Sequence, residues 1–250
     1  MMSSVGASIS RPGESSTNLW RNQARRLNLL GILALAGAAF WATALVAMHF
    51  LGPQTNDTST ISEYAVGPYG GLYMAADVAL GIGFVALALG IRGATTASRT
   101  LRIGSLLVGL NGLGWIVGGL FVVDPECGRA VPASLPCSEG GEPVTAHGTI
   151  HGLSGAISIL SLIVGMLVLS RAFKRDDSWR TFRPVSLALG LATLAQLVVG
   201  LFVLWGEGKP LDAASFRIFM ATLVLWLVLA AIRLRSVTRG ASIRQPARVR

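Results

Sequence analysis

The sequence has few charged residues for its length, and this scarcity excludes most classes of soluble protein. Asp, Glu, Lys and Arg together make up 13% of the 250 residues, against about 25% in soluble domains. Aromatic residues make up only 7%. The net charge of +9 would suggest nucleic-acid binding in a soluble protein. The sequence, however, lacks the aromatic-rich surface and the motif that such binding normally shows. The composition predicts an integral membrane protein that contacts membrane lipids and no nucleic acid.

Long hydrophobic runs are abundant, and six of them can cross a bilayer. Each is near or above the ~20 residues that a hydrocarbon layer of ~30 Å requires. They are Leu27–Leu51, Tyr69–Ile91, Thr100–Val123, Gly148–Ser170, Pro184–Trp205 and Ala213–Leu234. We therefore predict an all-α fold, a polytopic bundle of six transmembrane helices over residues 27–235. The polar segments 1–26 and 236–250 are expected to be disordered.

Basic residues are nearly absent from one set of connecting segments. All but three of the 21 Lys and Arg residues fall in the two tails, in the connections after the second and fourth runs, or at the ends of the runs that adjoin them. The exceptions are Arg129, Lys209 and Arg217. The positive-inside rule then places the N- and C-termini in the cytoplasm. We expect a multi-pass protein of the cell membrane, the cytoplasmic membrane of a bacterium.

Cysteine is also scarce, and both cysteines fall in one outward connection. Cys127 and Cys137 are separated by nine residues, and the helical runs contain no other cysteine. Because an outward loop is an oxidising environment, the pair predicts a disulfide. Closing so short a loop stabilises it by about 2–3 kcal/mol in the chain-entropy model. A metal site made from the two thiols is the alternative.

All three histidines fall toward the outward ends of the runs. His147 and His151 are four residues apart, so both imidazoles face one side of a helix. Asp124 ends the third run at the same depth, His49 ends the first, and Glu63 precedes the second. The topology therefore predicts one site made of the paired histidines and Asp124, with His49 or Glu63 beside it. A metal site, a structural hydrogen-bond network, and ligand or proton binding are the alternative roles of this cluster.

Asp77 is the one acidic residue within a predicted span. A carboxylate at that depth costs about 3 kcal/mol on insertion scales, so it should face the protein interior. Arg217, near the start of the sixth run, is the best-placed cation for Asp77, Glu207 or Asp124. Intramembrane acids are functional candidates, and Asp77 is therefore a catalytic candidate beside Glu63. A structural bond to a neighbouring helix is the alternative.

Small and polar residues indicate how the helices pack. Glycines spaced four apart let two helix backbones approach closely. Two such pairs are present, Gly114 with Gly118 and Gly148 with Gly152. Asn111 and Gln196 lie in the middle of their runs and are expected to hydrogen-bond across the bundle.

Three short motifs, in a fixed order, resemble a known family of bacterial and archaeal six-helix membrane proteins, the domain of unknown function 998 family. They are Ile61-Ser62-Glu63, Asp124-Pro125 and His147-Gly148-x-x-His151, preceded by His49. The resemblance covers nearly all of Leu27–Leu234. One departure is the long insertion between Asp124 and His147 that carries the cysteine pair. The resemblance implies the fold but no established activity.

Two function classes remain open. In the first, the polar cluster belongs to a non-catalytic membrane component with a transport, sensing or envelope accessory role. In the second, the histidines and Asp124 bind zinc, whose bound water attacks a lipid or headgroup at the outer leaflet with Glu63 as general base. The second class is also loosely similar in its chemistry to membrane hydrolases of the alkaline ceramidase and adiponectin-receptor type. Those enzymes have seven helices, so that similarity does not extend to the architecture.

Overall fold

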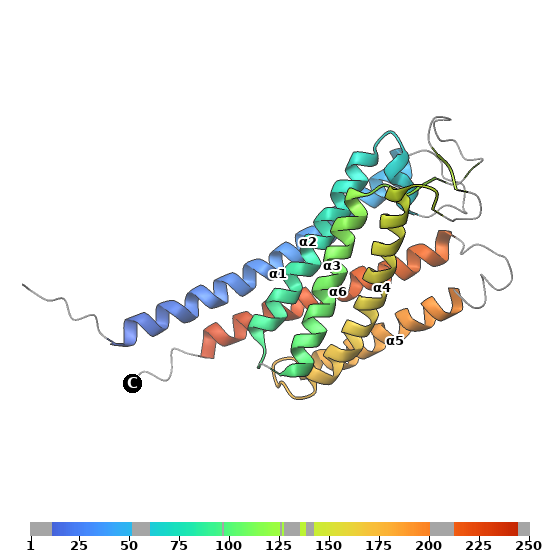
Figure 1. The fold of residues 1–250 in the computed structure, drawn as a ribbon. Coiled ribbons are helices and arrows are strands. Elements are labelled where there is room, and N and C mark those ends of the chain that lie inside the picture. Colours follow the sequence, from blue (N-terminus) through green and yellow to red (C-terminus); the bar gives the residue numbers. More distant parts are fainter. Residues whose placement is uncertain are drawn as a thin grey trace, which may run out of the picture.

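The computed structural model describes residues 12–51, 61–96, 98–125, 127, 136–138, 143–200 and 213–244. Nearly all of these residues are helical (Figure 1). The long helices are α1 (Pro12–Leu51), α2 (Gly70–Ala94), α3 (Arg99–Leu120), α4 (Ala146–Phe173), α5 (Arg183–Val199) and α6 (Ala213–Arg244). Two short 3-10 helices, η1 (Ile61–Val66) and η2 (Arg180–Phe182), precede α2 and α5.

Six of the described helices are long and apolar enough to cross a membrane, which confirms the predicted all-α fold with six candidate spans. The two terminal helices are longer than the apolar runs. Helix α1 begins at Pro12 and α6 ends at Arg244, so both extend into segments for which the sequence predicts disorder. Arg, Gln and Ala are good helix formers, which lets a helix continue beyond its apolar part.

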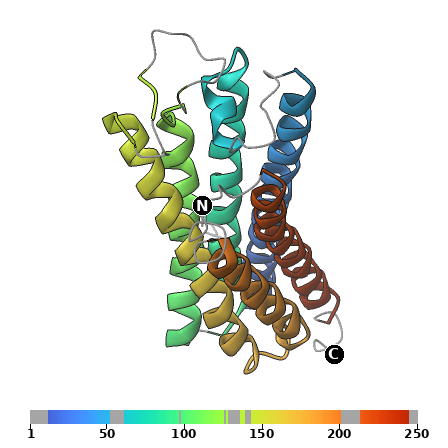
Figure 2. The same ribbon diagram turned by 90° about the vertical axis from the view of Figure 1, so that its right-hand side faces the viewer.

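Each helix packs against its neighbours in chain order, and α6 returns to α1 and α2. The start of α1 and the end of α6 lie at the same end of the bundle (Figure 1). We call this the basic end, because the ends of α2 and α4 and the starts of α3 and α5 carry their Arg and Lys residues here. The opposite end, with η1 and the start of α4, is called the disulfide end. From the η2 turn, α4 and α5 diverge toward the disulfide end (Figures 1 and 2).

Glycines bring the backbones of α1, α2 and α3 into close approach. A Cβ at Gly81 would lie 2.5 Å from the Gly112 carbonyl oxygen, and one at Gly112 would lie 2.6 Å from the Gly81 oxygen. A Cβ at Gly37 would lie 2.4 Å from the Ala79 oxygen. In lipid, where helices gain little from hydrophobic burial against each other, this backbone contact is a main source of packing energy.

The glycines of the two predicted pairs differ in what lies next to them. A Cβ at Gly114 would lie 2.2 Å from the Ser158 hydroxyl oxygen, so the close approach of α3 and α4 is confirmed there. Gly148 instead leaves room for the Asp124 carboxylate, 2.1 Å from where its Cβ would be. For Gly152 the prediction is wrong: no described atom lies within 4 Å of where its Cβ would be.

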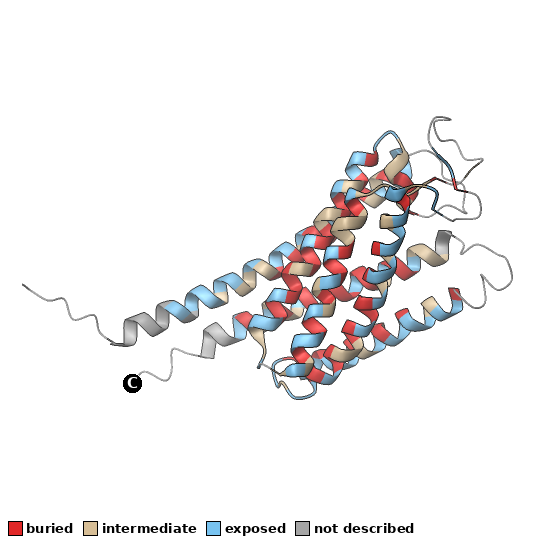
Figure 3. Ribbon diagram, viewed as in Figure 1, coloured by how far each residue is buried: buried red, intermediate tan, exposed pale blue. Residues whose placement is uncertain are grey.

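Buried residues concentrate where the helices face one another, and the outward faces of the bundle are apolar but exposed (Figure 3). At the basic end the Phe173 ring stacks on Trp179, with centroids 4.8 Å apart. Nearby, the Trp226 Nε1–H donates to Ser186 Oγ at 3.1 Å, and that hydroxyl donates to the Met166 carbonyl at 3.0 Å. This relay links α6, α5 and α4.

The expected hydrogen bonds of the mid-helix amides do not form as predicted. Asn111 is completely buried, yet its side-chain nitrogen and oxygen have no partner among the described residues. The Gln196 side-chain oxygen is unpaired in the same sense. The interhelical bond at this level uses main chain instead, because the Ser158 hydroxyl donates to the Asn111 carbonyl at 2.8 Å.

Candidate functional site

Asp124 joins the end of α3 to the start of α4. Its Oδ2 accepts from the main-chain N–H groups of Val144 and Thr145, both at 2.8 Å, and its Oδ1 accepts from the Thr145 hydroxyl at 2.6 Å. The Thr145 hydroxyl oxygen in turn accepts from the Gly148 N–H at 3.0 Å and caps α4. Both carboxylate oxygens of Asp124 are therefore committed to holding two helix ends together.

The same contacts set the protonation of Asp124. Partial burial alone would raise the pKa of this carboxyl, but hydrogen bonds from Thr145 and Val144 and the nearby His147 ring outweigh it. The pKa of Asp124 therefore lies below its ordinary value. A carboxylate held ionised by several donors is typical of a structural contact. We call Asp124 and its hydrogen bonds to Val144 and Thr145 the Asp124 bracket.

The two predicted imidazoles of α4 have different environments. His147 is exposed and packs against the Phe121 ring, with centroids 5.2 Å apart. His151 is half-buried, and its Nδ1 lies 3.0 Å from the Gly118 oxygen and 2.9 Å from the Phe121 oxygen. Because both partners are acceptors, Nδ1 must carry a proton, and Nε2 is the ring nitrogen left for other contacts.

The remaining predicted members lie on other elements. His49 is exposed in the last turn of α1, against Phe50. Glu63 is buried in η1 and engaged there with other groups. Within the described ranges, no three His, Cys, Asp or Glu side chains lie close enough to share a metal ion. The predicted donor set is thus not gathered into a metal site in the described part of the chain.

The predicted disulfide is present between Cys127 and Cys137, whose Cα atoms are 4.9 Å apart. Two main-chain hydrogen bonds accompany it, from Cys127 N to the Ser138 oxygen at 3.0 Å and from Ser138 N to the Pro125 oxygen at 2.7 Å. The bridge therefore attaches the 136–138 segment beside the end of α3, directly after Asp124. The connection's acidic residues Glu126, Glu139 and Glu142 lie outside the described residues.

Asp77 is almost completely buried, on the face of α2 that α1 covers. Its Oδ1 accepts a 2.8 Å hydrogen bond from the Trp41 indole of α1, and Tyr73, one turn earlier on α2, hydrogen-bonds to the same carboxyl. These two aromatic side chains are the partners, in place of the expected Arg217. The structural bond to a neighbouring helix, one of the two predicted roles, is therefore present.

A pocket of about 100 Å³ lies directly beside this carboxyl. We call it the Asp77 pocket. Its polar lining comes from Asp77, Tyr73, Trp115, His151 and Ser158, and Ser62 of η1 also lines it. Gly114, Gly118 and Gly155 leave the space free, and Ile61, Ile159, Phe216 and Met220 form its apolar wall. The pocket thus gathers residues from η1, α2, α3, α4 and α6.

One residue that lines the pocket has a polar atom without a partner among the described residues. The Trp115 indole Nε1 is buried and makes no hydrogen bond to any described residue. Its ring packs edge-on against Trp41, with centroids 6.0 Å apart. An unpaired buried donor costs about 1–3 kcal/mol. A donor lining a pocket recovers that cost when a ligand or a water accepts from it.

Sequence reasoning found Asp77 and His151 but not the two tryptophans of this site. Trp41 and Trp115 are apolar-looking members of apolar runs, and nothing local marks them as polar contacts. One signal was available for Trp115, which lies next to Gly114 and three residues before Gly118. A large side chain between two glycines that face a neighbouring helix is well placed to border a space that those glycines leave.

The chain belongs to the family described as protein of unknown function (DUF998), whose family model matches residues 34–233. No curated protein and no solved structure shows a significant match to the chain. The three motifs that carried the resemblance all lie at the disulfide end. Ser62 and His151 line the Asp77 pocket, and Asp124 fixes the start of the helix on which His151 is carried.

Proposed function

We propose that this member of the DUF998 family is a non-catalytic membrane protein that binds a small amphiphilic molecule in the Asp77 pocket, in a sensing or envelope accessory role. The observation that carries the proposal is the unpaired N–H of Trp115, a residue that lines a pocket with both apolar and polar side chains. Ligand sites are typically of this kind, mostly apolar with a few convergent polar groups.

The chemistry of the pocket supports a ligand that can both accept and donate hydrogen bonds. The Trp115 N–H supplies a donor, and the Nε2 of His151, the ring nitrogen that faces no carbonyl, supplies an acceptor. Phe216 and Met220 of α6 supply an apolar surface for the rest of the molecule. The ligand class is therefore a small alcohol, amine or amide with an apolar part.

Hydrolysis is less well supported than binding. A nucleophilic hydroxyl needs a base within hydrogen-bond reach. The Ser158 hydroxyl donates to the Asn111 carbonyl, and the protonated Nδ1 of His151 faces main-chain carbonyls. The described contacts of the His151 ring are to the main-chain oxygens of Gly118 and Phe121. The side chains at the pocket are thus arranged to hold a molecule in place.

A transport pathway is also less well supported. Between the pocket and the basic end, α2 and α6 are joined by fully buried side chains. They are Leu80, Phe84, Leu223 and Leu227, each 0% exposed. A substrate leaving the pocket toward the basic end would have to displace this packed layer, whose density is that of a protein core. The pocket is therefore closed toward the basic end.

The proposal includes an orientation. We infer that the basic end faces the cytoplasm and the disulfide end faces outward, because the described Lys and Arg residues concentrate at the former. The disulfide supports this orientation, since such bonds persist in oxidising compartments. The Asp77 pocket would then serve the outer half of the membrane.

Native mass spectrometry of protein released directly from its own membrane tests the proposed function. We expect wild type to carry a small-molecule adduct. Gly155→Trp should lose it, because Gly155 lines the pocket. Gly152→Trp, one turn away and exposed, is the matched control and should keep it. Neither glycine has a described atom within 4 Å of its Cβ position, but Gly152 does not line the pocket.

A second variant tests the donor itself. Trp115→Phe removes the N–H while keeping an aromatic ring, and it should lower adduct occupancy about 2–10-fold, the value of one hydrogen bond. Wild-type protein that carries no adduct contradicts the proposal. So does an adduct that persists unchanged in Gly155→Trp.

A further inference from the structure

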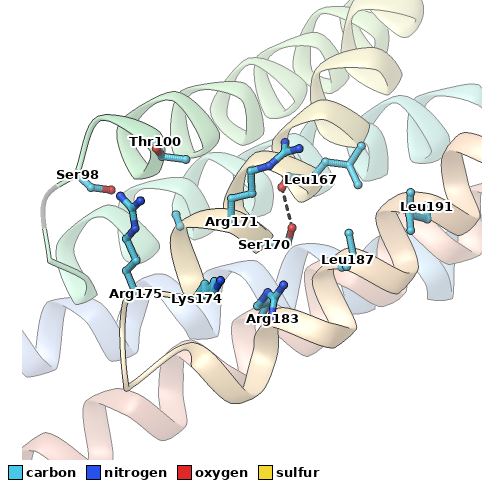
Figure 4. Close-up of a pocket in the computed structure, with 11 residues that line it drawn as sticks. Ser98, Thr100, Leu167, Ser170, Arg171, Lys174, Arg175, Arg183, Leu187 and Leu191 are labelled. Carbon is cyan, nitrogen blue, oxygen red and sulfur yellow. Dashed lines mark hydrogen bonds between the residues drawn. The ribbon is translucent and has the colours of Figure 1, made fainter.

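The basic end contains a second, larger cavity, and none of the motif residues described above lines it. It has a volume of about 750 Å³ and lies between the start of α3, the end of α4 and the start of α5. We call it the basic cleft. Its cationic lining consists of Arg171, Lys174, Arg175 and Arg183 (Figure 4). An adjoining cavity of about 530 Å³ shares Lys174 and Arg183 and adds Arg180.

The cations of the cleft are not neutralised by the protein. Arg171, Lys174, Arg175 and Arg183 are all exposed, and none of them is paired with a carboxylate within the described part of the chain. Asp176 lies in the same turn, but its oxygens accept from the N–H groups of Thr96 and Ser178 at 3.2 and 2.9 Å. Asp177 is exposed and forms no ion pair with them in the described part of the chain. The cleft therefore presents an uncompensated positive charge.

The other wall of the cleft is apolar. Leu167 of α4 and Leu187 and Leu191 of α5 line it (Figure 4). Leu191 is two helical turns further from the basic end than Arg183, so the apolar wall extends from the cations toward the middle of the bundle. Ser98 and Thr100 at the start of α3 add hydroxyl groups opposite Arg175. Charge and apolar surface are thus ordered along the cleft as headgroup and acyl chain are ordered in a lipid.

We propose that the basic cleft binds one anionic phospholipid, with its phosphate headgroup on the cations and an acyl chain along the leucines. Basic pockets between transmembrane helices bind acidic headgroups, and each Arg or Lys near an anionic surface contributes measurably to attraction. Arg in particular forms paired hydrogen bonds to phosphate oxygens. The bound lipid fills the space between α4 and α5 next to their short η2 connection.

The test is lipid titration of the detergent-purified chain, followed by native mass spectrometry. The probes are phosphatidylglycerol, zwitterionic phosphatidylcholine and inorganic phosphate. Wild type should bind one phosphatidylglycerol per chain in preference to phosphatidylcholine. The triple variant Arg171→Gln, Lys174→Gln, Arg183→Gln should bind it at least ~10-fold more weakly, since three cations near the headgroup are removed.

A charge-matched control separates a site from a general surface effect. The triple variant Arg26→Gln, Arg92→Gln, Arg102→Gln removes three exposed cations of the same end that do not line the cleft. It should retain phosphatidylglycerol binding. Equal loss in both triple variants overturns the proposal, because it would show a diffuse electrostatic effect. Circular dichroism of both variants checks that the helices remain folded.

Two further arms distinguish the lipid from its headgroup. Leu187→Gln should weaken phosphatidylglycerol binding while leaving any binding of inorganic phosphate unchanged, because it alters only the apolar wall. Inorganic phosphate that competes with the lipid at equal concentration overturns the lipid assignment and leaves a phosphate site. Equal binding of phosphatidylcholine and phosphatidylglycerol overturns the role of the cations.

Discussion

Replacing Gly148 by Ala should detach the Asp124 bracket, and Gly152→Ala is the matched control on the same helix. A Cβ at Gly148 would lie 2.1 Å from Asp124 Oδ2 and 2.5 Å from its Cγ, whereas nothing lies within 4 Å at Gly152. The carboxylate must therefore move away from Val144 and Thr145. Hydrogen bonds to a charged group are worth about 1.5–3 kcal/mol. The gain of about 0.5–1 kcal/mol from replacing helical Gly by Ala applies to both variants and largely cancels.

The measured difference between the two variants should thus be about 1.5–3 kcal/mol in the free energy of unfolding. At roughly 2–4 °C per kcal/mol for a chain of this size, Gly148→Ala should melt about 3–12 °C below Gly152→Ala. The assay is thermal unfolding of detergent-solubilised protein followed by circular dichroism. Equal melting temperatures for the two variants would refute the bracket.

The bracket also predicts the direction of a pH effect. The pKa of folded Asp124 is lowered, so the bracket's contribution is fully present above the unfolded carboxyl value of about 3.9. It declines as the pH falls below that value and is lost once the pH passes the folded-state pKa. The gap between Gly148→Ala and Gly152→Ala should therefore be constant from neutral pH to about pH 4 and then narrow. A gap that widens on acidification would contradict this reasoning.

Three other predictions follow from the same contacts. Ser186→Ala leaves the Trp226 N–H buried without its partner and should destabilise the protein by about 1–3 kcal/mol, whereas exposed Ser236→Ala should change the melting temperature little. Peptide mapping without reductant should find Cys127 linked to Cys137, and replacing both by Ser should cost about 2–3 kcal/mol; free thiols in protein from an oxidising compartment would count against the bond. A fluorescent protein fused to the C-terminus should be bright in cells, and a dark fusion together with an active phosphatase fusion at the same point would reverse the proposed orientation.

Much of the candidate site could be located from the sequence, but its contacts could not be assigned. The helical spacing of His147 and His151 correctly put both on α4, and the end of the third run correctly put Asp124 near them. The common depth of these residues along the membrane normal predicts that they share one site. Depth leaves the rotation of each helix undetermined, so it could not show that His151 would face the carbonyls of α3 while His147 faces Phe121.

What the sequence determined by itself is the architecture: six apolar helices, one buried carboxylate that needs a partner, and a cysteine pair close enough along the chain to join. These follow from the transfer free energy and length of each segment, which are properties of that segment alone. The tertiary structure decided which groups meet. Trp41 reaches Asp77 across 36 positions, the Trp115 N–H has no partner among the described residues, and cations of α4 and α5 share one cleft. Such pairings depend on which helices are neighbours and how closely their glycines let them approach, and no local pattern of residues contains that information.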